Sequence, residues 1–454
     1  MKIKDKLILD IIDVNYMGRG VAKLDDFVIF VIGAVTGDKV EAEITEVKKK
    51  YCVAEVKKII NSSEYRVEAK CKNFEKCGGC ALMNLKYDKQ LEFKNNQVLN
   101  SFKKARVNIE DAKINEIIGM ENPYRYRNKT AFAVRTDYKK SSNPVTIGTY
   151  GYRTHRLIDI DECLIQDEKV DILLRKIKKI IEDNKIESYD KRKKTGTIRH
   201  VVFRKNYLNE IMLIVVTSSE HFKGKEKFLA DLSAIGEDVV TIIQNINTKV
   251  SSDILGRRNI VLFGKGTFID KIFDKQFIVS PSTFLQVNHE QTEKLYDTAM
   301  RMADIKKTDT VLDLYCGSGT ISLIAAKQSL KVLGIDIVRQ SITDAKTNAR
   351  INNTKNVRFV CGKVEEKLPL WVDAKIEADV ILIDPPRVGC DIEAIKSMMI
   401  MKPKKIVYIS CNPSTLTRDA SSIIEAGYKI SEIQTVDMFC HTSAVETVVL
   451  FEKR

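Results

Sequence analysis

Short apolar runs broken by polar and glycine residues fill the first 60 residues of the chain. They read KLILDIIDV, GVAKLDDFVIFV and DKVEAEITEVKKKYCVAEVKKII, with Asp25-Asp26 and four glycines between strand-like pieces. Several short strands with turn residues between them are typical of a small β-barrel. We therefore predict an N-terminal barrel over residues 1–60.

The pattern over residues 61–280 is mixed. A helical stretch covers about 86–105 and another surrounds VDILLRKIKKIIED, while TAFAVR, TIRHVVFR and EIMLIVVT have strand composition. We predict a central α+β domain. The helical stretch near 87–121 is expected to pack against the domain that follows.

From about residue 281 to residue 454, apolar runs alternate with segments of helix length. The runs are TVLDLYCGSGT, KVLGIDIV, NVRFVCG, DVILIDPPR, KIVYISCNP and TVVLFEK. Successive apolar residues indicate strands covered on both faces, and the alternation predicts a Rossmann-like, doubly wound α/β sheet. Because ligands bind beyond the carboxyl ends of such strands, we look for chemistry there.

Charge is distributed unevenly over the 454 residues, whose net charge is +14. Residues 1–280 hold 52 Lys and Arg against 39 Asp and Glu, whereas residues 281–454 hold 23 against 22. A polyanion such as a nucleic acid would be bound by the first two thirds, although a solvated lysine-rich surface gives the same count. Tyr16 and Tyr51 beside the lysines at 48–50 suit a surface that stacks bases and follows phosphates.

The apolar runs are too short for a membrane segment. No stretch of 18 apolar residues occurs, and Asp10 and Asp13 interrupt the basic N-terminus. We therefore expect neither a transmembrane helix nor a signal peptide, and a cytoplasmic protein.

Four of the ten cysteines form a distinctive pattern. Cys71, Cys77 and Cys80 fall within ten residues, two glycines separate the last pair, and Cys163 comes much later. Reduced thiolates at such spacing hold a 4Fe–4S cluster or a structural zinc, and the residues alone do not choose between them. A redox-active CGGC pair is a weaker alternative because it leaves Cys71 unexplained.

A glycine turn follows the first strand of the C-terminal sheet, in DLYCGSGT. The dinucleotide fingerprint would require a third glycine, but position 322 is serine, and Asp336 ends the next strand. A carboxylate there can accept the ribose hydroxyls of a nucleoside without a bound pyrophosphate. S-adenosylmethionine therefore fits better than NAD, while a purely structural turn is the plain alternative.

Three further motifs stand at strand ends. In DPPR, two prolines present Asp384 rigidly, and Arg387 stands where enzymes acting on exocyclic amines carry an aromatic residue. In SCNP, Cys411 is a candidate nucleophile, with Cys390 as a competitor and a buried structural cysteine as the alternative. In HTSAVE, Glu446 enters an apolar strand, where burial would raise its pKa toward that of a general base, unless it is salt-bridged.

Together these motifs resemble the S-adenosylmethionine-dependent RNA (uracil-5-)-methyltransferases, in particular the branch that acts on 23S ribosomal RNA. The resemblance covers the whole chain, from a TRAM-like barrel through the C-x5-C-x2-C cluster to SPSTFLQVN, DLYCGSGT, GID, DPPR, SCNPSTLTRD and HTSAVE. It implies a Rossmann-like methyltransferase domain at 281–454, a TRAM barrel of the oligonucleotide-binding (OB-like) type at 1–60, and a central iron–sulfur domain at 61–280. It also implies a monomer that binds 23S ribosomal RNA and no membrane.

The resemblance assigns roles to particular residues. Cys411 would be the nucleophile and Glu446 the general base. The predicted contacts to the methyl donor are Gln286, Tyr315, Asp336 and Asp384. The predicted ligands of a 4Fe–4S cluster are Cys71, Cys77, Cys80 and Cys163. The residues expected to face RNA are Phe284, Arg125, Arg127 and Lys129. Family members often carry Glu at the position of Asp336.

The reaction needs one cysteine and one carboxylate at the same edge of the sheet. Thiolate addition at C6 makes C5 of uracil nucleophilic, and a base later removes the C5 proton. A cytosine-5 RNA methyltransferase, which also uses a cysteine, is the first alternative. A non-catalytic RNA-binding iron–sulfur protein is the second. Relatives that modify tRNA are expected to lack the barrel and the cysteine cluster, which favours ribosomal RNA.

Overall fold

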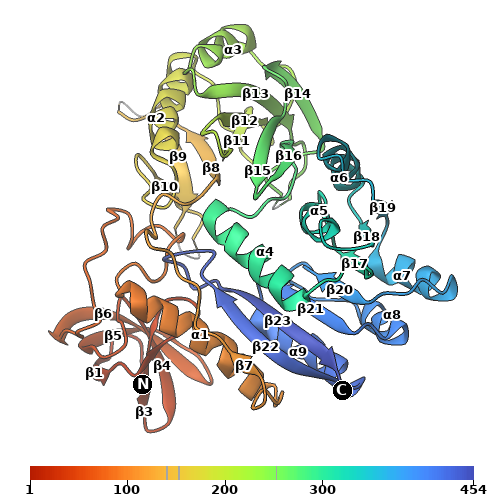
Figure 1. The fold of residues 1–454 in the computed structure, drawn as a ribbon. Coiled ribbons are helices and arrows are strands. Elements are labelled where there is room, and N and C mark those ends of the chain that lie inside the picture. The colour runs from red at the N-terminus through yellow and green to blue at the C-terminus, as the bar shows by residue number, and fades with distance from the viewer. Residues whose placement is uncertain (140–141, 152–153, 252) are drawn as a thin grey trace.

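The computed structural model describes residues 1–139, 142–151, 154–251 and 253–454. The chain forms an N-terminal barrel, a central sheet with its helices, and a large C-terminal sheet (Figure 1). Within these residues no helix is both long and apolar enough to cross a membrane.

Six strands confirm the predicted β-structure of the N-terminal domain. They are β1 (Lys6–Asp10), β2 (Asp13–Val14), β3 (Gly20–Leu24), β4 (Phe27–Ile32), β5 (Lys39–Val47) and β6 (Tyr51–Asn61). Their order in the sheet is β1-β5-β6-β4-β3-β2. Alternate residues of β5, namely Val40, Ala42 and Ile44, are buried, which is the period-two pattern of a strand with one face on a core.

The central sheet has the order β10-β9-β8-β11-β12-β13-β14. Its strands are β8 (Lys129–Thr136), β9 (Val145–Tyr150), β10 (Leu157–Asp159), β11 (Ile198–Lys205), β12 (Ile211–Thr217), β13 (Val239–Ile246) and β14 (Arg258–Phe263). The helices α2 (Glu168–Asp183) and α3 (Lys225–Ser233) pack against it through a shared apolar core. A separate hairpin, β15 (Phe268–Ile272) and β16 (Lys275–Val279), leads to the C-terminal domain.

The C-terminal sheet has eight strands in the order β19-β18-β17-β20-β21-β23-β22-β7. Its strands are β7 (Lys113–Ile114), β17 (Thr310–Leu314), β18 (Lys331–Asp336), β19 (Val357–Cys361), β20 (Val380–Ile383), β21 (Lys405–Ser410), β22 (Tyr428–Val436) and β23 (Glu446–Lys453). The first five in sheet order run parallel, whereas β23 is antiparallel to both neighbours. The predicted α/β methyltransferase-like sheet is confirmed.

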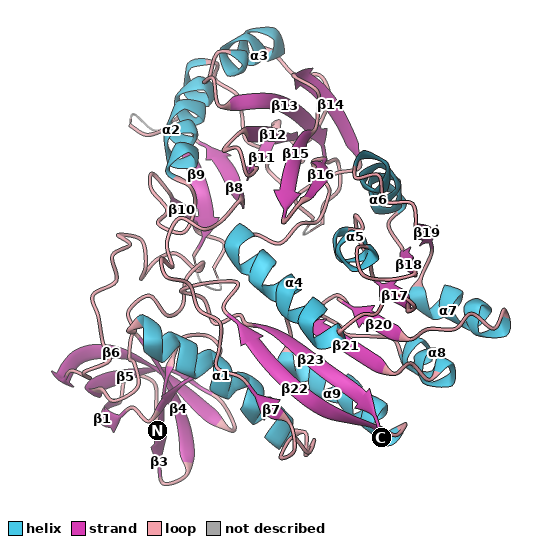
Figure 2. Ribbon diagram, viewed as in Figure 1, coloured by secondary structure: helices cyan, strands magenta, loops and turns pink. Residues whose placement is uncertain are grey.

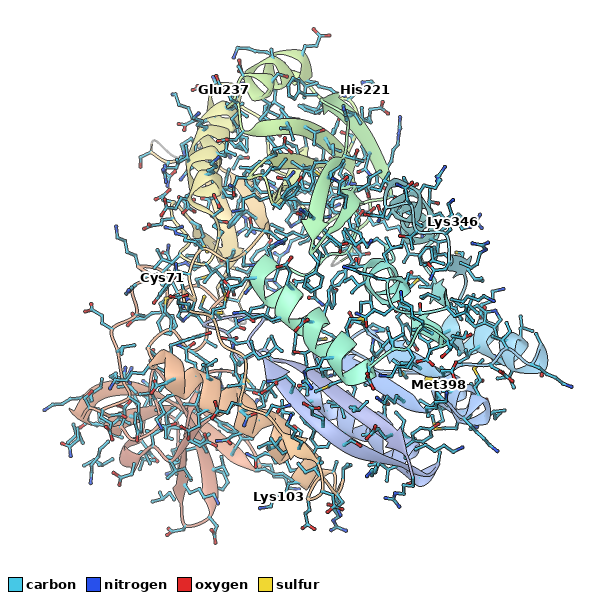
Figure 3. All side chains as sticks on the ribbon, viewed as in Figure 1. Cys71, Lys103, His221, Glu237, Lys346 and Met398 are labelled. Atoms are coloured by element: carbon cyan, nitrogen blue, oxygen red, sulfur yellow. The ribbon has the colours of Figure 1, made fainter. Side chains whose placement is uncertain are left out.

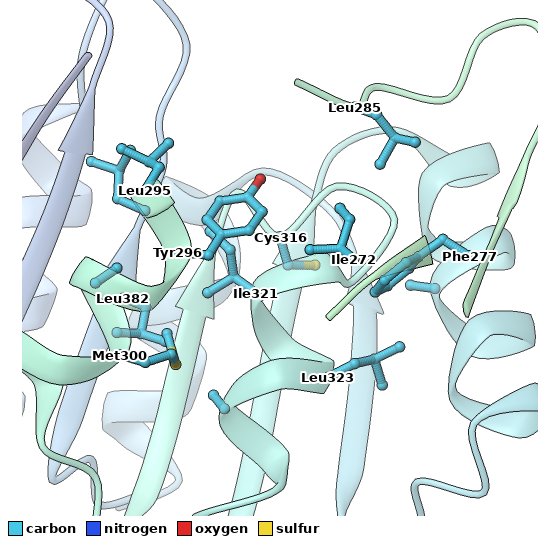
Figure 4. Close-up of a cluster of buried hydrophobic side chains, with 14 of the residues drawn as sticks. Ile272, Phe277, Leu285, Leu295, Tyr296, Met300, Cys316, Ile321, Leu323 and Leu382 are labelled. Carbon is cyan, nitrogen blue, oxygen red and sulfur yellow. The ribbon is translucent and has the colours of Figure 1, made fainter. Parts of the chain in front are cut away.

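Helices cover both faces of this sheet (Figure 2). The core on one face includes side chains from α4 (His289–Ala303), α5 (Thr320–Ala326) and α6 (Arg339–Ile351), and part of it is shown in Figure 4. The core on the other face includes side chains from α1 (Tyr87–Lys104), α7 (Val364–Asp373), α8 (Ile392–Met401) and α9 (Pro413–Glu425).

The segment that follows the barrel is built into the C-terminal domain. Helix α1 buries Gln90, Lys94, Val98 and Phe102, a stripe with four-residue spacing, and the last two join the core of the C-terminal sheet. Strand β7 then pairs in parallel with β22. The segment from α1 to β7 therefore packs with the C-terminal sheet, although it precedes the other strands of that sheet by about 200 residues in the chain.

The barrel packs directly against the turn that follows Cys80. Gly18 has a φ of +71°, and a Cβ at this position would stand 2.2 Å from the carbonyl oxygen of Ala81. Only glycine fits both the backbone conformation and this approach. The barrel is thus in close contact with the segment that carries Cys71, Cys77 and Cys80.

Candidate active site

Three of the predicted residues meet at one edge of the C-terminal sheet. Asp384 follows the last residue of β20, Cys411 follows the last residue of β21, and Glu446 begins β23. Ser410 of β21 pairs with Thr447 of the antiparallel strand β23. The next residue along each strand from this pair is Cys411 on one side and Glu446 on the other, so the two are placed opposite each other. The strand order β20-β21-β23 then places Asp384 on the other side of Cys411.

The loop around Cys411 is tied to the backbone of the loop that carries Arg387. Asn412 caps α9 by accepting from the backbone N–H of Ser414 at 3.1 Å, and its amide donates to the carbonyl oxygen of Arg387 at 2.9 Å. Burial and the nearby Glu446 raise the pKa of the Cys411 thiol to about 11, while Arg387 acts in the opposite direction. The start of α9 adds a partial positive charge that favours a thiolate.

Glu446 is the most unusual carboxyl group of the site. Its side chain is 2% exposed, and its Oε2 has no hydrogen-bond partner among the described residues. Burial, reinforced by Asp384, raises the pKa of Glu446 well above its ordinary value, and burial raises the pKa of Asp384 to about 7. A carboxylate with a raised pKa is a stronger base, as the sequence analysis expected of Glu446.

The ends of β17 and β18 form a cradle for a nucleoside. Asp336 accepts hydrogen bonds from the backbone N–H groups of Gly317 at 3.0 Å and Val338 at 2.7 Å. A Cβ at Gly317 would meet nothing within 4 Å, and the buried hydroxyl of Ser318 has no hydrogen-bond partner among the described residues. Ile337 and Val338 are exposed apolar residues directly after Asp336. These features fit S-adenosylmethionine.

The other predicted donor contacts lie on neighbouring loops. Tyr315 has a φ of +66°, and its phenol lies against Cys390 below the sheet edge. Gln286 is buried, and its carbonyl oxygen accepts from the Asn128 amide at 3.0 Å, while Phe284 on the same loop is 62% exposed. Contacts of these residues with a donor or with RNA remain predictions.

A cleft of about 1290 Å³ separates the barrel from the C-terminal domain, and Cys411 lines it. The barrel lines it with Tyr16, Arg19, Phe30 and Tyr51, and the rings of Phe30 and Tyr51 are 5.3 Å apart. Helix α1 lines it with Lys89, Glu92, Phe93, Asn96, Gln97, Asn100, Ser101 and Lys104. Aromatic and basic side chains beside a nucleophile suit single-stranded nucleic acid.

Sequence reasoning overlooked the α1 wall of this cleft. A usable signal was present, because Asn96, Asn100 and Lys104 recur every four residues in a helix. Asparagine is a poor helix former, so its repetition on one face calls for a reason other than helix stability.

The basic residues of YRYRNK are engaged within the protein. Arg125 pairs with Asp171 at 2.6 Å and Glu162 at 3.1 Å, and donates to the carbonyl oxygen of Cys163 at 2.8 Å. Burial lowers the pKa of Lys129 to about 8, with Arg204 and Arg127 contributing. This placement argues against the RNA contact predicted for Arg125, whose charge holds the loop of Cys163.

The four predicted cluster ligands line one cavity of about 220 Å³, namely Cys71, Cys77, Cys80 and Cys163. Cys71 lies between the barrel and the central domain in Figure 3, and Arg127 also lines the cavity. Burial raises the pKa of the Cys163 thiol to about 11. Over the described ranges, no three His, Cys, Asp or Glu side chains come close enough to hold a metal ion.

The competing catalytic residues are poorly placed. Cys390 is 6% exposed, burial raises the pKa of its thiol to about 12, and its Sγ contacts the hydroxyl of Tyr408 at 3.8 Å. His441 is buried, and burial lowers its pKa to about 4. Both are buried, and neither lines the cleft that Cys411 lines, so Cys411 and Glu446 remain the better pair.

Comparison with known proteins agrees with this geometry. Residues 86–454 match the family model described as tRNA (Uracil-5-)-methyltransferase. The chain belongs to this family. Its members are S-adenosylmethionine-dependent enzymes that methylate RNA, and residues 8–57 in addition match the TRAM domain.

Relatives of the same length exist among bacterial members of the family. A Clostridium tetani protein described as an uncharacterized RNA methyltransferase is 42% identical over 434 residues, covering 95% of this chain and 93% of its own. A Staphylococcus aureus (strain N315) protein with the same description is 41% identical over 442 residues, covering 97% and 96%.

A solved structure resembles the whole chain. It is the Pyrococcus abyssi tRNA (uracil-54, C5)-methyltransferase in complex with S-adenosyl-L-homocysteine, with a TM-score of 0.76, 26% identity, and coverage of 98% of this chain and 100% of that one. Because this tRNA enzyme matches nearly all of the chain, barrel region included, our expectation that tRNA-modifying relatives generally lack the barrel does not hold for it. The barrel therefore does not distinguish ribosomal RNA from tRNA as the substrate.

Proposed function

We propose that this protein methylates C5 of a uridine in 23S ribosomal RNA, with Cys411 as nucleophile and Glu446 as general base. The observation that carries the proposal is the adjacent placement of Cys411 and Glu446 on one ladder, beside a basic and aromatic cleft. The raised pKa of Glu446 suits a base, and Arg387 partly offsets the rise that burial and Glu446 cause in the pKa of the Cys411 thiol.

The residues would act in a fixed order. The Cys411 thiolate adds to C6 of a uracil flipped out of its stack, and the electron pair of the C5–C6 double bond makes C5 nucleophilic. The nucleophilic C5 would then take the methyl group of S-adenosylmethionine bound at Asp336 and the adjoining glycine turn, and S-adenosylhomocysteine would leave. Glu446 then removes the C5 proton, the C5–C6 double bond re-forms, and the thiolate leaves. Asp384, Gln286 and Tyr315 would complete the donor site.

The four cysteines would hold a 4Fe–4S cluster. The four thiols line one cavity, and their C-x5-C-x2-C spacing with a distant fourth cysteine is the pattern on which this proposal rests. Protein purified without oxygen should be brown and contain about four irons per chain. Stoichiometric zinc without iron would overturn the assignment.

The choice of ribosomal RNA rests on the motifs shared with the 23S branch. A tRNA substrate is the second candidate, because the Pyrococcus abyssi tRNA enzyme is similar over the whole length. Cytosine-5 methylation is a further alternative, since it also uses a cysteine.

The test is methyl transfer to defined RNA. Unmodified 23S ribosomal RNA and unmodified tRNA are each incubated with the protein and methyl-labelled S-adenosylmethionine, and nucleosides are then analysed by mass spectrometry. We expect label in 5-methyluridine from ribosomal RNA and none with Cys411→Ala. Label in tRNA alone would reassign the substrate, 5-methylcytidine would reassign the base, and no transfer to either RNA would contradict the proposal.

A further inference from the structure

The loop that leads into Glu446 is held by residues far away in the sequence. It spans residues 437–445 between β22 and β23, and Val436 pairs with Glu446 as the last pair of that ladder. Asp437 therefore lies one residue beyond the partner of Glu446. A shift of Asp437 would displace the end of β22, whose last residue, Val436, pairs with Glu446.

Helix α1 anchors Asp437. Lys94 and Asp437 form an ion pair in which neither side chain is exposed, and the hydroxyl of Tyr87 donates to Asp437 Oδ2 at 2.7 Å. The Lys94 ammonium also donates to the carbonyl oxygen of Phe439 at 3.0 Å, and Tyr87 accepts from the backbone N–H of Met120 at 2.9 Å. A buried ion pair adds little stability compared with apolar side chains, but it can specify one geometry.

The same stretch of chain supplies further anchors to the loop. The backbone N–H groups of Ala81 and Leu82 donate to the carbonyl oxygen of His441 at 2.9 and 3.0 Å, and the hydroxyl of Tyr126 donates to that of Cys440 at 3.0 Å. The donors to the loop thus include residues next to Cys80, where the barrel also docks. Cys411, by contrast, is placed by β21 and α9.

We propose that Lys94 and Asp437 are positioning residues for Glu446 and control the step in which methylated RNA is released. This inference rests on the proposed function, because release is the step that needs Glu446. Proton removal requires the carboxylate within hydrogen-bond reach of C5, so a small displacement of the strand end slows it. Thiolate addition and methyl transfer depend on Cys411 and the donor site, which lie on other elements, so we expect both steps to change far less than release.

The test compares formation and release of the covalent protein–RNA adduct. The full-length Lys94→Met/Asp437→Asn double variant removes both charges with side chains of similar shape, so no buried charge is left unpaired. Tyr87→Phe removes one hydroxyl and keeps the ion pair. Lys103→Met, at an exposed position of the same helix (Figure 3), is the matched control.

Each variant is mixed with RNA and methyl-labelled S-adenosylmethionine, and adduct that resists denaturation is followed in a single turnover. In the double variant we expect release to fall at least about tenfold while adduct formation stays within about twofold. Tyr87→Phe should slow release about fivefold, roughly the contribution of one hydrogen bond. Lys103→Met should behave like the unaltered protein.

Two results would overturn the inference: equal losses in formation and release, which indicate a merely structural role, or no change in either. If the double variant does not fold, Tyr87→Phe decides by the same criteria. Glu446→Gln, measured in parallel, distinguishes failure of the proposed function from failure of the positioning role. Absence of adduct in Glu446→Gln would refute the proposed function, whereas adduct in that variant with unchanged release in the others would refute only the positioning role.

Discussion

Replacing Asp384 by asparagine should stabilise the protein in a pH-dependent manner. Burial raises the pKa of Asp384 to about 7, from an ordinary value of 3.8. Below pH 4 the carboxyl group is protonated in both the folded and the unfolded chain. As the pH rises, the unfolded chain loses the proton first, so folding becomes less favourable by about 1.4 kcal/mol per pH unit until about pH 7. Above that pH the full cost of about 4 kcal/mol is present.

Asparagine keeps the shape of the side chain and carries no charge. The Asp384→Asn variant should therefore be more stable than the unaltered protein by about 4 kcal/mol at pH 8 and by only about 2 kcal/mol at pH 5. Urea unfolding followed by tryptophan fluorescence measures this, because the single tryptophan, Trp371, packs against the core of the C-terminal domain. A stability difference independent of pH, or a variant less stable at pH 8, would refute the reasoning.

Three further predictions concern the cleft. Alkylation of Cys411 by iodoacetamide, followed by peptide mass spectrometry, should accelerate about tenfold per pH unit below the thiol pKa of about 11. In Arg387→Gln the alkylation should be slower at each pH, because the cation of Arg387 favours the thiolate. An alkylation rate that does not change with pH would contradict this prediction. RNA affinity should fall steeply with salt, in line with the excess charge of residues 1–280, and a flat dependence measured by filter binding would count against it. Tyr16→Ala and Tyr51→Ala should each weaken binding by about 1–3 kcal/mol if they stack bases, whereas unchanged affinity would remove the barrel from the interface.

The sequence predicted the strand ends well, because local patterns determine them. An apolar run followed by Asp-Pro-Pro or Cys-Asn-Pro has to end where the proline stops it, so Asp384 and Cys411 could be placed without knowing the fold. Burial of Glu446 followed from its position at the start of an apolar strand. These features depend on residues close together in the chain.

Contacts between distant segments were not predictable in this way. Arg125 looked like a free basic residue in YRYRNK, but its partner Asp171 comes from a helix 46 positions later. Lys94 and Asp437 are 343 residues apart, and a lysine on a buried helical stripe was the only local hint of the pair. Likewise, the cleft between the barrel and Cys411 arises from docking, which one sequence does not reveal.

The most direct test of the account is the chemical identity of the adduct in Glu446→Gln. The variant is incubated with ribosomal RNA and methyl-labelled S-adenosylmethionine, denatured, digested with protease and nuclease, and analysed by mass spectrometry. We predict a peptide containing Cys411 joined through sulfur to a uridine that carries the labelled methyl group. A crosslink at Cys390, an unmethylated base on Cys411, or no crosslink in an otherwise folded protein would contradict it.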